Sequence, residues 1–316
     1  MDNQTRIYQL IILGAGPAGT AAGVYAARKK IDTLIITENF GGQAVVAAKI
    51  ENIIGFEEIS GVEMAQRFEK QLRRYSELNI VLDKIVEIKE EKGIFAVKTN
   101  REIFYGERIL AALGRRYRHL GVPKEKELEG KGVFYCSTCD APLMKNKEVA
   151  VIGGGNSALL SVMDLLPFAS KIYLLTNEAD LRCDPVLIDR IKHDPKVEVH
   201  YNVEILAIEG EKKVNGLRYR EGNNANDHWL GVGGIFIQAG MQPNSELFKQ
   251  LVKCNEFEEI IVEPLSGKTS HPKIWAAGDI TNLPYKQISV AIGDGVRALL
   301  DIYDNKIQIS NLKSQN

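Results

Sequence analysis

The chain has 316 residues, 45% of them hydrophobic and 26% charged, which is the composition of an ordinary globular protein. This length exceeds the usual size of a single hydrophobic core and predicts two domains. The 40 basic residues almost balance the 41 acidic ones, and the net charge of -1 gives no electrostatic basis for binding nucleic acid or a membrane surface. We therefore expect partners to be recognised by local features.

Targeting and cysteine content point to an intracellular redox protein. The polar residues 1–5 lack the basic and apolar regions of a secretory leader, and the apolar run 10–13 is too short to cross a bilayer, which predicts a cytoplasmic protein. Four cysteines are too few for a disulfide scaffold at this length, and a close pair in a reducing compartment is typical of redox or metal chemistry. No other cysteine or histidine pair has zinc-ligand spacing, so redox chemistry is favoured and no metal is expected.

A strand, a glycine-rich turn and a helix are predicted twice along the chain. The first set has a strand over 8–13, a glycine fingerprint over 14–19, a helix over 17–29 and a strand over 33–37. The second set has a strand over 148–152, a fingerprint over 153–158, a helix over 156–166 and a strand over 172–175. Each set is typical of a Rossmann-like unit, in which a crossover helix joins two buried parallel strands.

Further runs have the composition of antiparallel strands joined by charged turns. They lie at 80–88 and 94–99, and at 197–209 and 213–220. We therefore predict a β-meander in each unit and an α/β fold with two Rossmann-like, three-layer (ββα) nucleotide-binding domains. The polar segments 222–227 and 310–316 are expected to be exposed loop and chain end.

The glycines of a fingerprint have separate roles. The first allows a tight turn, the second lets the backbone approach a pyrophosphate, and the third permits close packing of a helix whose first amides face the anion. In the first fingerprint these are Gly14, Gly16 and Gly19, and Glu38 is placed to accept a ribose hydroxyl. The alternative is a turn without a ligand and a surface acid, but the strand before the turn and the helix after it favour a nucleotide site.

A cysteine pair lies between the two fingerprints. Cys136 and Cys139 have the spacing that closes a small disulfide loop, the thiolate is the species that reacts in disulfide exchange, and the adjoining Asp140 can manage the proton. The alternatives to a redox role are that the two cysteines have this spacing by chance or form half of a metal-binding site. We interpret Cys183 and Cys254 as ordinary cysteines. Two nucleotide sites and a dithiol in one chain indicate electron transfer.

Motifs across nearly the whole chain resemble those of the low-molecular-weight thioredoxin reductases in order and spacing. They are 14–19, Phe-Gly-Gly-Gln at 40–43, Ile-Glu-Asn-Ile-Ile-Gly at 50–55, 136–140, 153–158, Gly-Met-Gln-Pro-Asn at 240–244 and Ala-Ala-Gly-Asp at 276–279. The segments 133–136 and 284–287 are most similar to the flavoprotein that reduces alkyl hydroperoxide reductase peroxidases. The resemblance is strong for the family and weaker for the substrate.

The resemblance implies a division of the chain and a cofactor. An FAD-binding domain would comprise residues 1–117 and 245–316, and a pyridine-nucleotide-like domain with the dithiol would comprise residues 118–244. The implied FAD contacts are Gly14, Gly16, Pro17, Ala18, Gly19, Glu38, Gly41, Gly42, Gln43, Asn52, Gly114, Asp279, Gln287 and Ile288. The implied function is an FAD-dependent disulfide reductase, acting as a homodimer, whose partner is a thioredoxin- or glutaredoxin-like protein.

The resemblance also assigns roles around the dithiol. Cys139 would face the flavin, Cys136 would attack the partner disulfide, and Asp140 would donate or accept the proton. Because FAD and dithiol fall in different domains, the family's rotation of the second domain is implied, with hinges near 114–121 and 240–244. A basic cluster lies at the first crossing, namely Arg115, Arg116, Arg118 and His119. We hypothesise that it docks an acidic partner; a solvated linker is the alternative.

The segment expected to choose the electron donor departs from the family pattern. The implied NAD(P)H contacts are Gly153, Gly155, Asn156, Ser157, Ala158 and Arg182. Thioredoxin reductases usually have an acid after the fingerprint, and a His-Arg-Arg run with a later arginine for the 2′-phosphate of NADPH. This chain has Leu160 and Thr-Asn-Glu at 176–178 instead and keeps only Arg182. Because bidentate arginine contacts make phosphate recognition strong, we favour NADH over NADPH.

Three other interpretations stay open. Residues 136–143 are similar to those of a branch of the family that takes electrons from a ferredoxin-like donor. Direct reduction of a peroxidase partner is another alternative among enzymes. A flavin-binding redox sensor without turnover would be a different class of protein.

Overall fold

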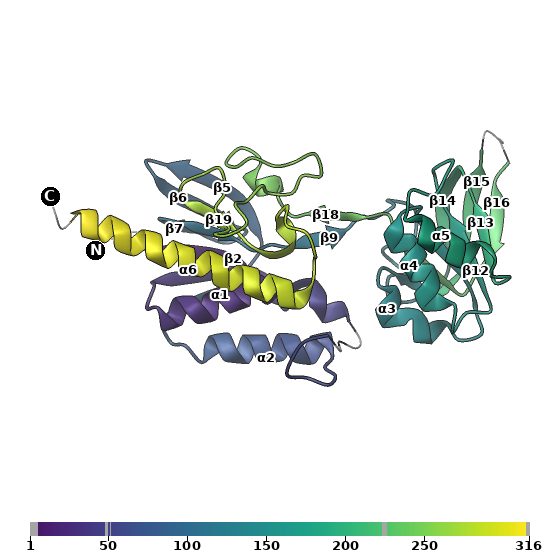
Figure 1. The fold of residues 1–316 in the computed structure, drawn as a ribbon, viewed down its shortest axis with the longest axis horizontal. Helices are drawn as coiled ribbons and strands as arrows, with labels where there is room; N and C mark the ends of the chain where they lie inside the picture. The colour runs from purple at the N-terminus through teal and green to yellow at the C-terminus, as the bar shows by residue number, and fades with distance from the viewer. Residues whose placement is uncertain (1–5, 48–49, 51, 223–225, 314–316) are drawn as a thin grey trace. The chain divides into compact units, whose positions relative to one another are not determined.

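The computed structural model describes residues 6–47, 50, 52–222 and 226–313. The chain divides into two compact units, unit 1 (Met1–Arg116 and Gln242–Asn316) and unit 2 (Tyr117–Met241) (Figure 1). The chain passes between them at β9 (Arg115–Tyr117) and β18 (Met241–Pro243), which pair with each other. Glu51, part of the 50–55 motif, lies outside the described residues.

Unit 1 is built around a five-stranded parallel sheet. Its strand order is β19 (Ile274–Ala276), β8 (Ile109–Ala111), β2 (Leu10–Ala15), β3 (Thr33–Phe40) and β4 (Leu78–Leu82). Helices α1 (Pro17–Arg28) and α6 (Ile288–Lys313) lie side by side along this sheet, and α2 (Gly61–Arg73) packs beside α1 (Figure 1). This is the α/β core that the first set of sequence patterns predicts.

A second sheet makes the third layer of unit 1. It contains β1 (Ile7–Tyr8), β7 (Ile103–Gly106), β6 (Ile94–Thr99) and β5 (Ile85–Glu91), of which β5, β6 and β7 form an antiparallel meander. The residues of β2 alternate between two cores: Leu10 and Ile12 pack with the alanines of α1, and Ile11 and Leu13 pack with the second sheet. A strand buried on both faces explains why β2 is a continuous apolar run. The three-layer arrangement is therefore confirmed for unit 1.

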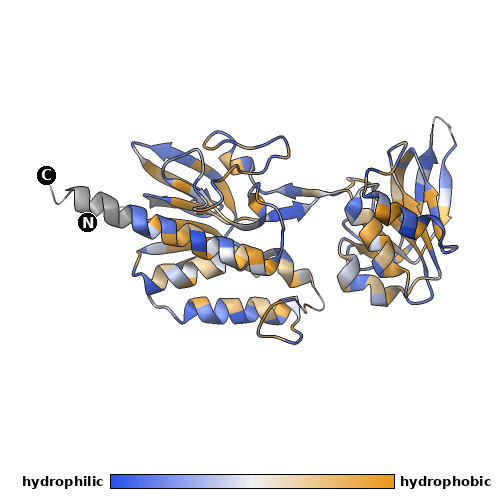
Figure 2. Ribbon diagram, in the orientation of Figure 1, coloured by the Kyte–Doolittle hydropathy of each residue, from blue (hydrophilic) through white to orange (hydrophobic). Residues whose placement is uncertain are grey.

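Unit 2 repeats the arrangement. Its parallel sheet has the order β10 (Val133–Phe134), β17 (Gly234–Ile237), β11 (Glu148–Ile152), β12 (Lys171–Leu175) and β13 (Val197–His200). One layer holds α3 (Ser137–Asp140), α4 (Asn156–Leu165) and α5 (Pro185–Lys192). The other is the antiparallel meander β14 (Val203–Gly210), β15 (Val214–Glu221) and β16 (His228–Gly231). The central strands are hydrophobic in both units, whereas α2 is mostly hydrophilic (Figure 2).

Two predicted strands are wrong in extent. The run 80–88 is divided between β4 and β5, and the run 197–209 between β13 and β14, so each run contributes to two different sheets. The first break lies at Asp83, whose carboxylate accepts the amides of Lys84 at 2.8 Å and Arg101 at 3.1 Å. The second lies at Asn202, whose φ of 54° ends an extended strand.

None of the helices in the described part of the chain combines the length and apolar character needed to span a membrane.

Candidate functional site

The first fingerprint connects β2 to α1 through a turn that requires glycine. Gly14 has a φ of 100°, and a Cβ there would lie 2.5 Å from the carbonyl oxygen of Ala112. A Cβ on Gly19 would lie 1.9 Å from the carbonyl oxygen of Gly14. At Gly16, by contrast, the nearest atom to an added Cβ is the Gly42 Cα at 3.8 Å. Two of the glycines are therefore required by packing, whereas Gly16 leaves room for a Cβ in ordinary van der Waals contact with Gly42, and we call this side of the turn its open face.

This open face lies at the start of a helix. Gly16 is the N-cap of α1 and supplies no side-chain cap, while Pro17 occupies the first position and lacks an amide hydrogen. The amides of Ala18 and Gly19 come next, and first-turn amides have no acceptor within their own helix. Such a helix start attracts an anion. The first turn carries no acidic side chain that would oppose a pyrophosphate.

Further predicted contacts lie next to this turn. Gly41 donates its amide to the carbonyl of Ala15 at 2.9 Å, and Gly41 and Gly42 both have positive φ, at 81° and 57°. Gln43 follows in the 3-10 helix η1 (Gly42–Val46). Glu38 is exposed near the carboxyl end of β3, the parallel neighbour of β2, so it lies at the same sheet edge as the fingerprint. An exposed acid at this edge can meet a ribose.

The remaining predicted FAD contacts come from parts of unit 1 that are distant in sequence. The side-chain amide of Asn52 donates to the Gln287 Oε1 at 3.2 Å, although 235 positions separate them. Ile288 begins α6 and packs with a small cluster around Ile50, Ile59 and Met64. Gly114 has a φ of 64°, and its carbonyl accepts the amide of Asn244 at 3.0 Å.

Asp279 lies in η4 (Gly278–Ile280), beside the helix start. A Cβ on Gly278 would come within 3.1 Å of the Ala18 Cβ, which shows how close η4 lies to α1. Burial raises the pKa of Asp279, opposed by the positive charges of Arg115 and Lys286. The Arg115 Nε lies 3.4 Å from an Asp279 oxygen, yet this buried nitrogen donates a well-formed hydrogen bond to none of the described acceptors. An open glycine face, a free helix start and an unsatisfied buried donor fit a bound dinucleotide.

The dithiol begins where β10 ends. Cys136 and Cys139 form a disulfide with a Cα–Cα distance of 5.4 Å, and Cys136 is the N-cap of the short helix α3. Asp140 donates its backbone amide to the carbonyl of Cys136 at 3.2 Å, and burial raises the pKa of its side chain to about 6. Cys183 and Cys254 are free, and burial raises the pKa of both thiols, which makes them less reactive.

Two clusters that hold this segment were not predicted from the sequence. The buried Glu125 accepts hydrogen bonds from Tyr135, the residue before Cys136, and from the amides of Leu120 and Gly121. Asp164 accepts hydrogen bonds from the two residues between the cysteines. Neither acid belongs to a motif, and the only sequence signal is the pair of hydroxyl residues inside the cysteine loop.

The second fingerprint makes the same turn between β11 and α4. Gly153 has a φ of 145°, and a Cβ on it would lie 2.5 Å from the Gln238 carbonyl oxygen. Gly155 is the N-cap of α4, followed by Asn156 and the exposed Ser157, while Ala158 is fully buried. The turn thus places a glycine N-cap at the end of β11, as the first fingerprint does at the end of β2, although here the Ala158 amide already donates to the Gly155 carbonyl at 3.0 Å.

A neighbouring segment of unit 2 lies against this turn. The amide of Arg182 donates to the Gly154 carbonyl at 2.9 Å, and the amide of Asp184 donates to the Asn156 side chain at 2.8 Å. The Arg182 guanidinium pairs with Glu178 at 2.8 Å. Thr176, at the end of β12, is only 1% exposed and accepts the amide of Glu178. Arg182, a predicted nucleotide contact, is therefore already engaged by a carboxylate.

The basic cluster at the first crossing is largely neutralised. Arg115 faces Asp279, Arg116 pairs with Glu246, and His119 contacts Glu125. Only Arg118 has no acidic partner among the described residues. The hypothesis of an acid-docking patch is thus not supported, because most of its positive charge is compensated within each unit.

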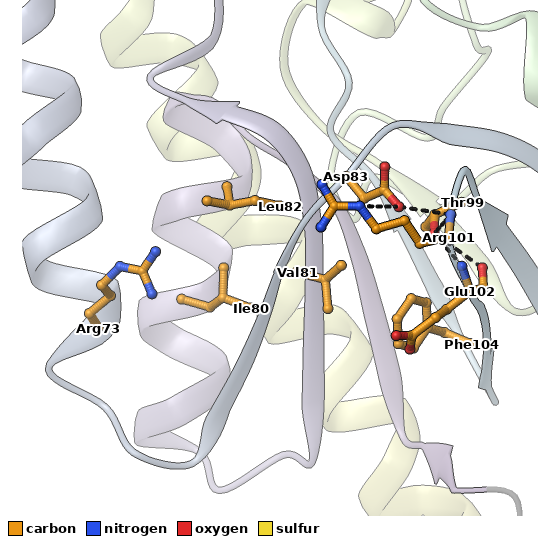
Figure 3. Close-up of a pocket in the computed structure, with 9 residues that line it drawn as sticks. All are labelled: Arg73, Ile80, Val81, Leu82, Asp83, Thr99, Arg101, Glu102 and Phe104. Carbon is orange, nitrogen blue, oxygen red and sulfur yellow. Dashed lines mark hydrogen bonds and ion pairs between the residues drawn. The ribbon is translucent and has the colours of Figure 1, made fainter.

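A separate pocket in unit 1 contains no predicted site residue. It has a volume of about 350 Å³ and lies between β4 and the strands β6 and β7 (Figure 3). Its lining residues are Arg73, Ile80, Val81, Leu82, Asp83, Thr99, Arg101, Glu102 and Phe104. Its acid Asp83 is engaged by backbone amides, and Arg73 pairs with Glu69. In the described part of the chain, no three His, Cys, Asp or Glu side chains are grouped as metal ligands.

Comparison with known proteins identifies the family. The model of the pyridine nucleotide-disulphide oxidoreductase family matches residues 8–295. This chain belongs to that family. Flavin and NAD(P)H use are properties of the family, and the fingerprints and the disulfide are the features expected of such an oxidoreductase.

Curated relatives share most of this chain. One component of the alkyl hydroperoxide reductase of Pseudomonas putida is 37% identical over 98% of the chain. An NADH dehydrogenase of Bacillus subtilis is 34% identical over 95% of the chain. The chain spans about 60% of the length of these relatives, 60% of the first and 59% of the second.

Solved structures of similar fold include thioredoxin reductases. The enzyme from Streptococcus pyogenes has a TM-score of 0.76 and 31% identity, with 94% of this chain and 97% of that one covered. The enzyme from T. acidophilum has a TM-score of 0.72 and 33% identity, with 96% and 99% covered. The oxidoreductase is therefore thioredoxin reductase-like in fold, as the sequence motifs predict.

Proposed function

We propose that this oxidoreductase is an FAD-dependent disulfide reductase that passes electrons from NADH through Cys136 and Cys139 to a thioredoxin- or glutaredoxin-like protein. The observation that carries the proposal is the Cys136–Cys139 disulfide, which is followed directly by an acid with a raised pKa and shares unit 2 with a nucleotide fingerprint. A structural disulfide would need no such proton carrier.

Unit 1 would hold the flavin. The open face at Gly16 and the start of α1 would receive the pyrophosphate, Glu38 the ribose, and Asn52, Gln287 and Asp279 the ring end. When bound, FAD would accept two electrons from a donor and release them to the disulfide. The protein's part is to fix the pyrophosphate at the helix start and to supply hydrogen-bond partners at the ring.

Unit 2 would carry out the exchange. Each turnover reduces the Cys136–Cys139 disulfide with two electrons and two protons. The thiolate of Cys136 then attacks the partner disulfide, and the thiolate of Cys139 resolves the mixed disulfide, which releases the reduced partner. Asp140 would take and return the proton of the thiols, because its pKa near 6 allows both protonation states at neutral pH.

The proposed flavin and dithiol residues belong to different units. We propose that unit 1 is the FAD domain and unit 2 the pyridine-nucleotide-like domain, near the predicted boundaries 1–117 with 245–316 and 118–244. The chemistry then requires unit 2 to bring first the donor and later the disulfide to the flavin, with β9 and β18 as hinges. A homodimer and a cytoplasmic location remain predictions from the sequence.

Two observations support NADH as the donor. Thr-Asn-Glu at 176–178 stands where the family has its His-Arg-Arg run, and the retained later arginine, Arg182, is paired with Glu178. A relative is also an NADH dehydrogenase. The second candidate function is reduction of a peroxidase partner, which the alkyl hydroperoxide reductase relative favours. A ferredoxin-like donor is the alternative at the electron-input side.

Rapid mixing under anaerobic conditions tests the proposal. The flavin of the purified protein is followed by its absorbance after mixing with NADH, NADPH or reduced ferredoxin. We expect bleaching by NADH, and bleaching by ferredoxin alone would overturn the donor assignment.

A cysteine variant separates the enzyme from a redox sensor. Cys136→Ser should bind flavin normally and reduce neither a thioredoxin nor a peroxidase disulfide. A wild-type protein that bleaches but shows no turnover with any disulfide partner would instead indicate a sensor.

A further inference from the structure

The two residues inside the cysteine loop are tied to one carboxylate. The Ser137 hydroxyl donates to the Asp164 Oδ2 at 2.8 Å, and the Thr138 hydroxyl donates to the same oxygen at 3.0 Å. The Ser161 hydroxyl donates in turn to the Ser137 oxygen at 2.9 Å. The loop that closes the disulfide is therefore held at both of its intervening side chains.

Both anchoring residues come from α4. Ser161 and Asp164 are three positions apart and so lie on the same face of this helix, which packs against α3. Ser161 is only 1% exposed and Ser137 only 7%, so the hydrogen bond between their hydroxyl groups is shielded from water. The anchor is therefore firm because its three hydrogen bonds are connected and its inner part is buried.

We propose that Asp164 is a positioning residue that holds the cysteine loop in its closed form and thereby sets the reduction potential of the Cys136–Cys139 pair. The inference rests on the proposed function, since it assumes that this disulfide is redox-active. It adds a residue outside the cysteine motif and names the property that this residue controls.

The physical reason is the effective concentration of one thiol near the other. When the disulfide is reduced, the covalent constraint on the loop disappears and the two sulfurs can separate. Hydroxyl bonds to Asp164 keep the loop near the closed geometry, so that less conformational freedom is lost when the bond forms again. The disulfide is thereby favoured over the dithiol, and the reduced pair becomes a stronger reductant for its partner.

The test measures the equilibrium of the full-length protein with dithiothreitol redox buffers, in which the free thiols are trapped by alkylation and counted. Asp164→Ala is expected to lower the disulfide-to-dithiol equilibrium constant about tenfold, a shift of about 30 mV toward easier reduction. Asp164→Asn keeps an acceptor oxygen and should stay within about threefold of the wild type, which is the rescue that a tether predicts. An Asn shift equal to the Ala shift would overturn the proposal, because the charge and not the tether would then be responsible.

A second variant removes the same tether, the hydrogen bonds of Ser137 and Thr138 to Asp164, by changing the two hydroxyl residues of the cysteine loop. Ser137→Ala combined with Thr138→Val should reproduce the Asp164→Ala shift, and the triple variant should show no further shift. This hydroxyl variant leaves α4 untouched, so it also carries the test if Asp164→Ala does not fold. A shift below threefold in the hydroxyl variant would overturn the proposal.

The matched control is Asp189→Ala. Asp189 is an exposed acid on α5 of the same unit and has no hydrogen-bond partner among the described residues. It should leave the equilibrium unchanged, and an equal shift there would also overturn the proposal. If the wild-type Cys136–Cys139 disulfide could not be reduced in any redox buffer, the proposed function would be wrong. If it were reduced normally but its equilibrium constant were unchanged by Asp164→Ala, only the positioning role of Asp164 would be wrong.

Discussion

Tyr135, the residue before Cys136, donates its phenolic hydrogen to the buried Glu125 Oε1 at 2.8 Å. The ring of Tyr135 also stacks on Tyr117 with centroids 5.2 Å apart. Glu125 is 2% exposed and accepts the amides of Leu120 at 3.0 Å and Gly121 at 2.8 Å. The start of the dithiol segment is thereby fixed to the segment that follows β9.

Glu125→Ala should therefore destabilise unit 2. The substitution leaves the phenol and two backbone amides without their acceptor, which costs about 3 kcal/mol in the free energy of unfolding. Hydrogen exchange of the β10 and β17 amides measures this change within unit 2 alone. The control is Glu127→Ala, which removes an exposed acid two positions along and should cost less than about 0.5 kcal/mol. Equal exchange rates in both variants would contradict the assigned role.

The same carboxyl makes unit 2 sensitive to acid. Burial by itself raises the pKa of Glu125, but the hydrogen bonds from Tyr135, Leu120 and Gly121 outweigh it and hold the pKa below the ordinary value of 4.5. A lowered pKa in the folded state stabilises the protein above the unfolded pKa, and this stability is lost as the pH falls through the folded pKa. We expect the unfolding free energy of unit 2 to fall below about pH 4.5, and to fall less in Glu125→Gln.

Asp140 should give the disulfide exchange a pH dependence. Burial raises its pKa to about 6, so the carboxylate that accepts a thiol proton becomes available as the pH rises through this value. The rate of partner-disulfide reduction should rise accordingly, and Asp140→Asn should remove the inflection and slow turnover about a hundredfold. Turnover measured with a thioredoxin from pH 5 to pH 8 checks both. An unchanged inflection in Asp140→Asn would assign it to another group.

Stability gives an independent readout of Asp140 with the opposite pH dependence from Glu125. Because its folded pKa is raised, its contribution to stability is complete below the ordinary value of 3.8 and is lost as the pH rises through about 6. Asp140→Asn should consequently be more stable than the wild type at pH 8 and not at pH 4. Denaturation at these two pH values provides the comparison.

Much of the fold could be predicted from local sequence because the patterns there are strong. β2, α1, β11 and α4 were found from apolar runs and glycine turns, since a strand buried on both faces leaves little choice of residue. The breaks within 80–88 and 197–209 were not found. The break at Asp83 depends on the amide of Arg101, 18 positions away, and no local pattern reports such a bond.

The candidate site likewise contains residues that local motifs predict and residues that only tertiary packing brings together. The glycines, the cysteines and Asp140 belong to motifs and were named from the sequence. Asp164 was missed because it contacts Ser137 only when α4 packs on α3, 27 positions apart. The ion pairs of the basic cluster were not predicted, because Glu246 and Asp279, which pair with Arg116 and Arg115, are distant in sequence.

Gly16→Ala should separate flavin binding from folding. Among the described residues outside its chain neighbours, no atom lies closer than 3.8 Å to the added Cβ, so the chain should fold. The Cβ would, however, occupy the side of the turn proposed to meet the pyrophosphate. We expect at least about a tenfold loss of FAD affinity, since each 1.4 kcal/mol of lost contact is tenfold. Fluorescence titration of the flavin-free protein with FAD measures it.

The control for this prediction is Gly293→Ala in α6. In the described part of the chain, a Cβ there meets no atom within 4 Å beyond its own helix backbone, and alanine is a better helix former than glycine, so FAD affinity should not change. Gly19→Ala, whose Cβ would collide with the Gly14 carbonyl, should instead impair folding. If Gly16→Ala bound FAD as tightly as Gly293→Ala, the pyrophosphate could not lie against this turn.

Glu178 should influence which nucleotide is preferred. Its carboxylate pairs with Arg182 at 2.8 Å, and Arg182 is the arginine that the sequence predicts among the NAD(P)H contacts. Glu178→Ala should free it and raise kcat/KM for NADPH relative to NADH about fivefold, since one exposed charge-assisted contact contributes about 1 kcal/mol. Glu178→Ala with Arg182→Ala should restore the wild-type ratio. Glu209→Ala removes a carboxylate paired with Arg218 in the same unit and should not change it. An unchanged ratio in Glu178→Ala would place the 2′-phosphate away from Arg182, or exclude the nucleotide from this turn.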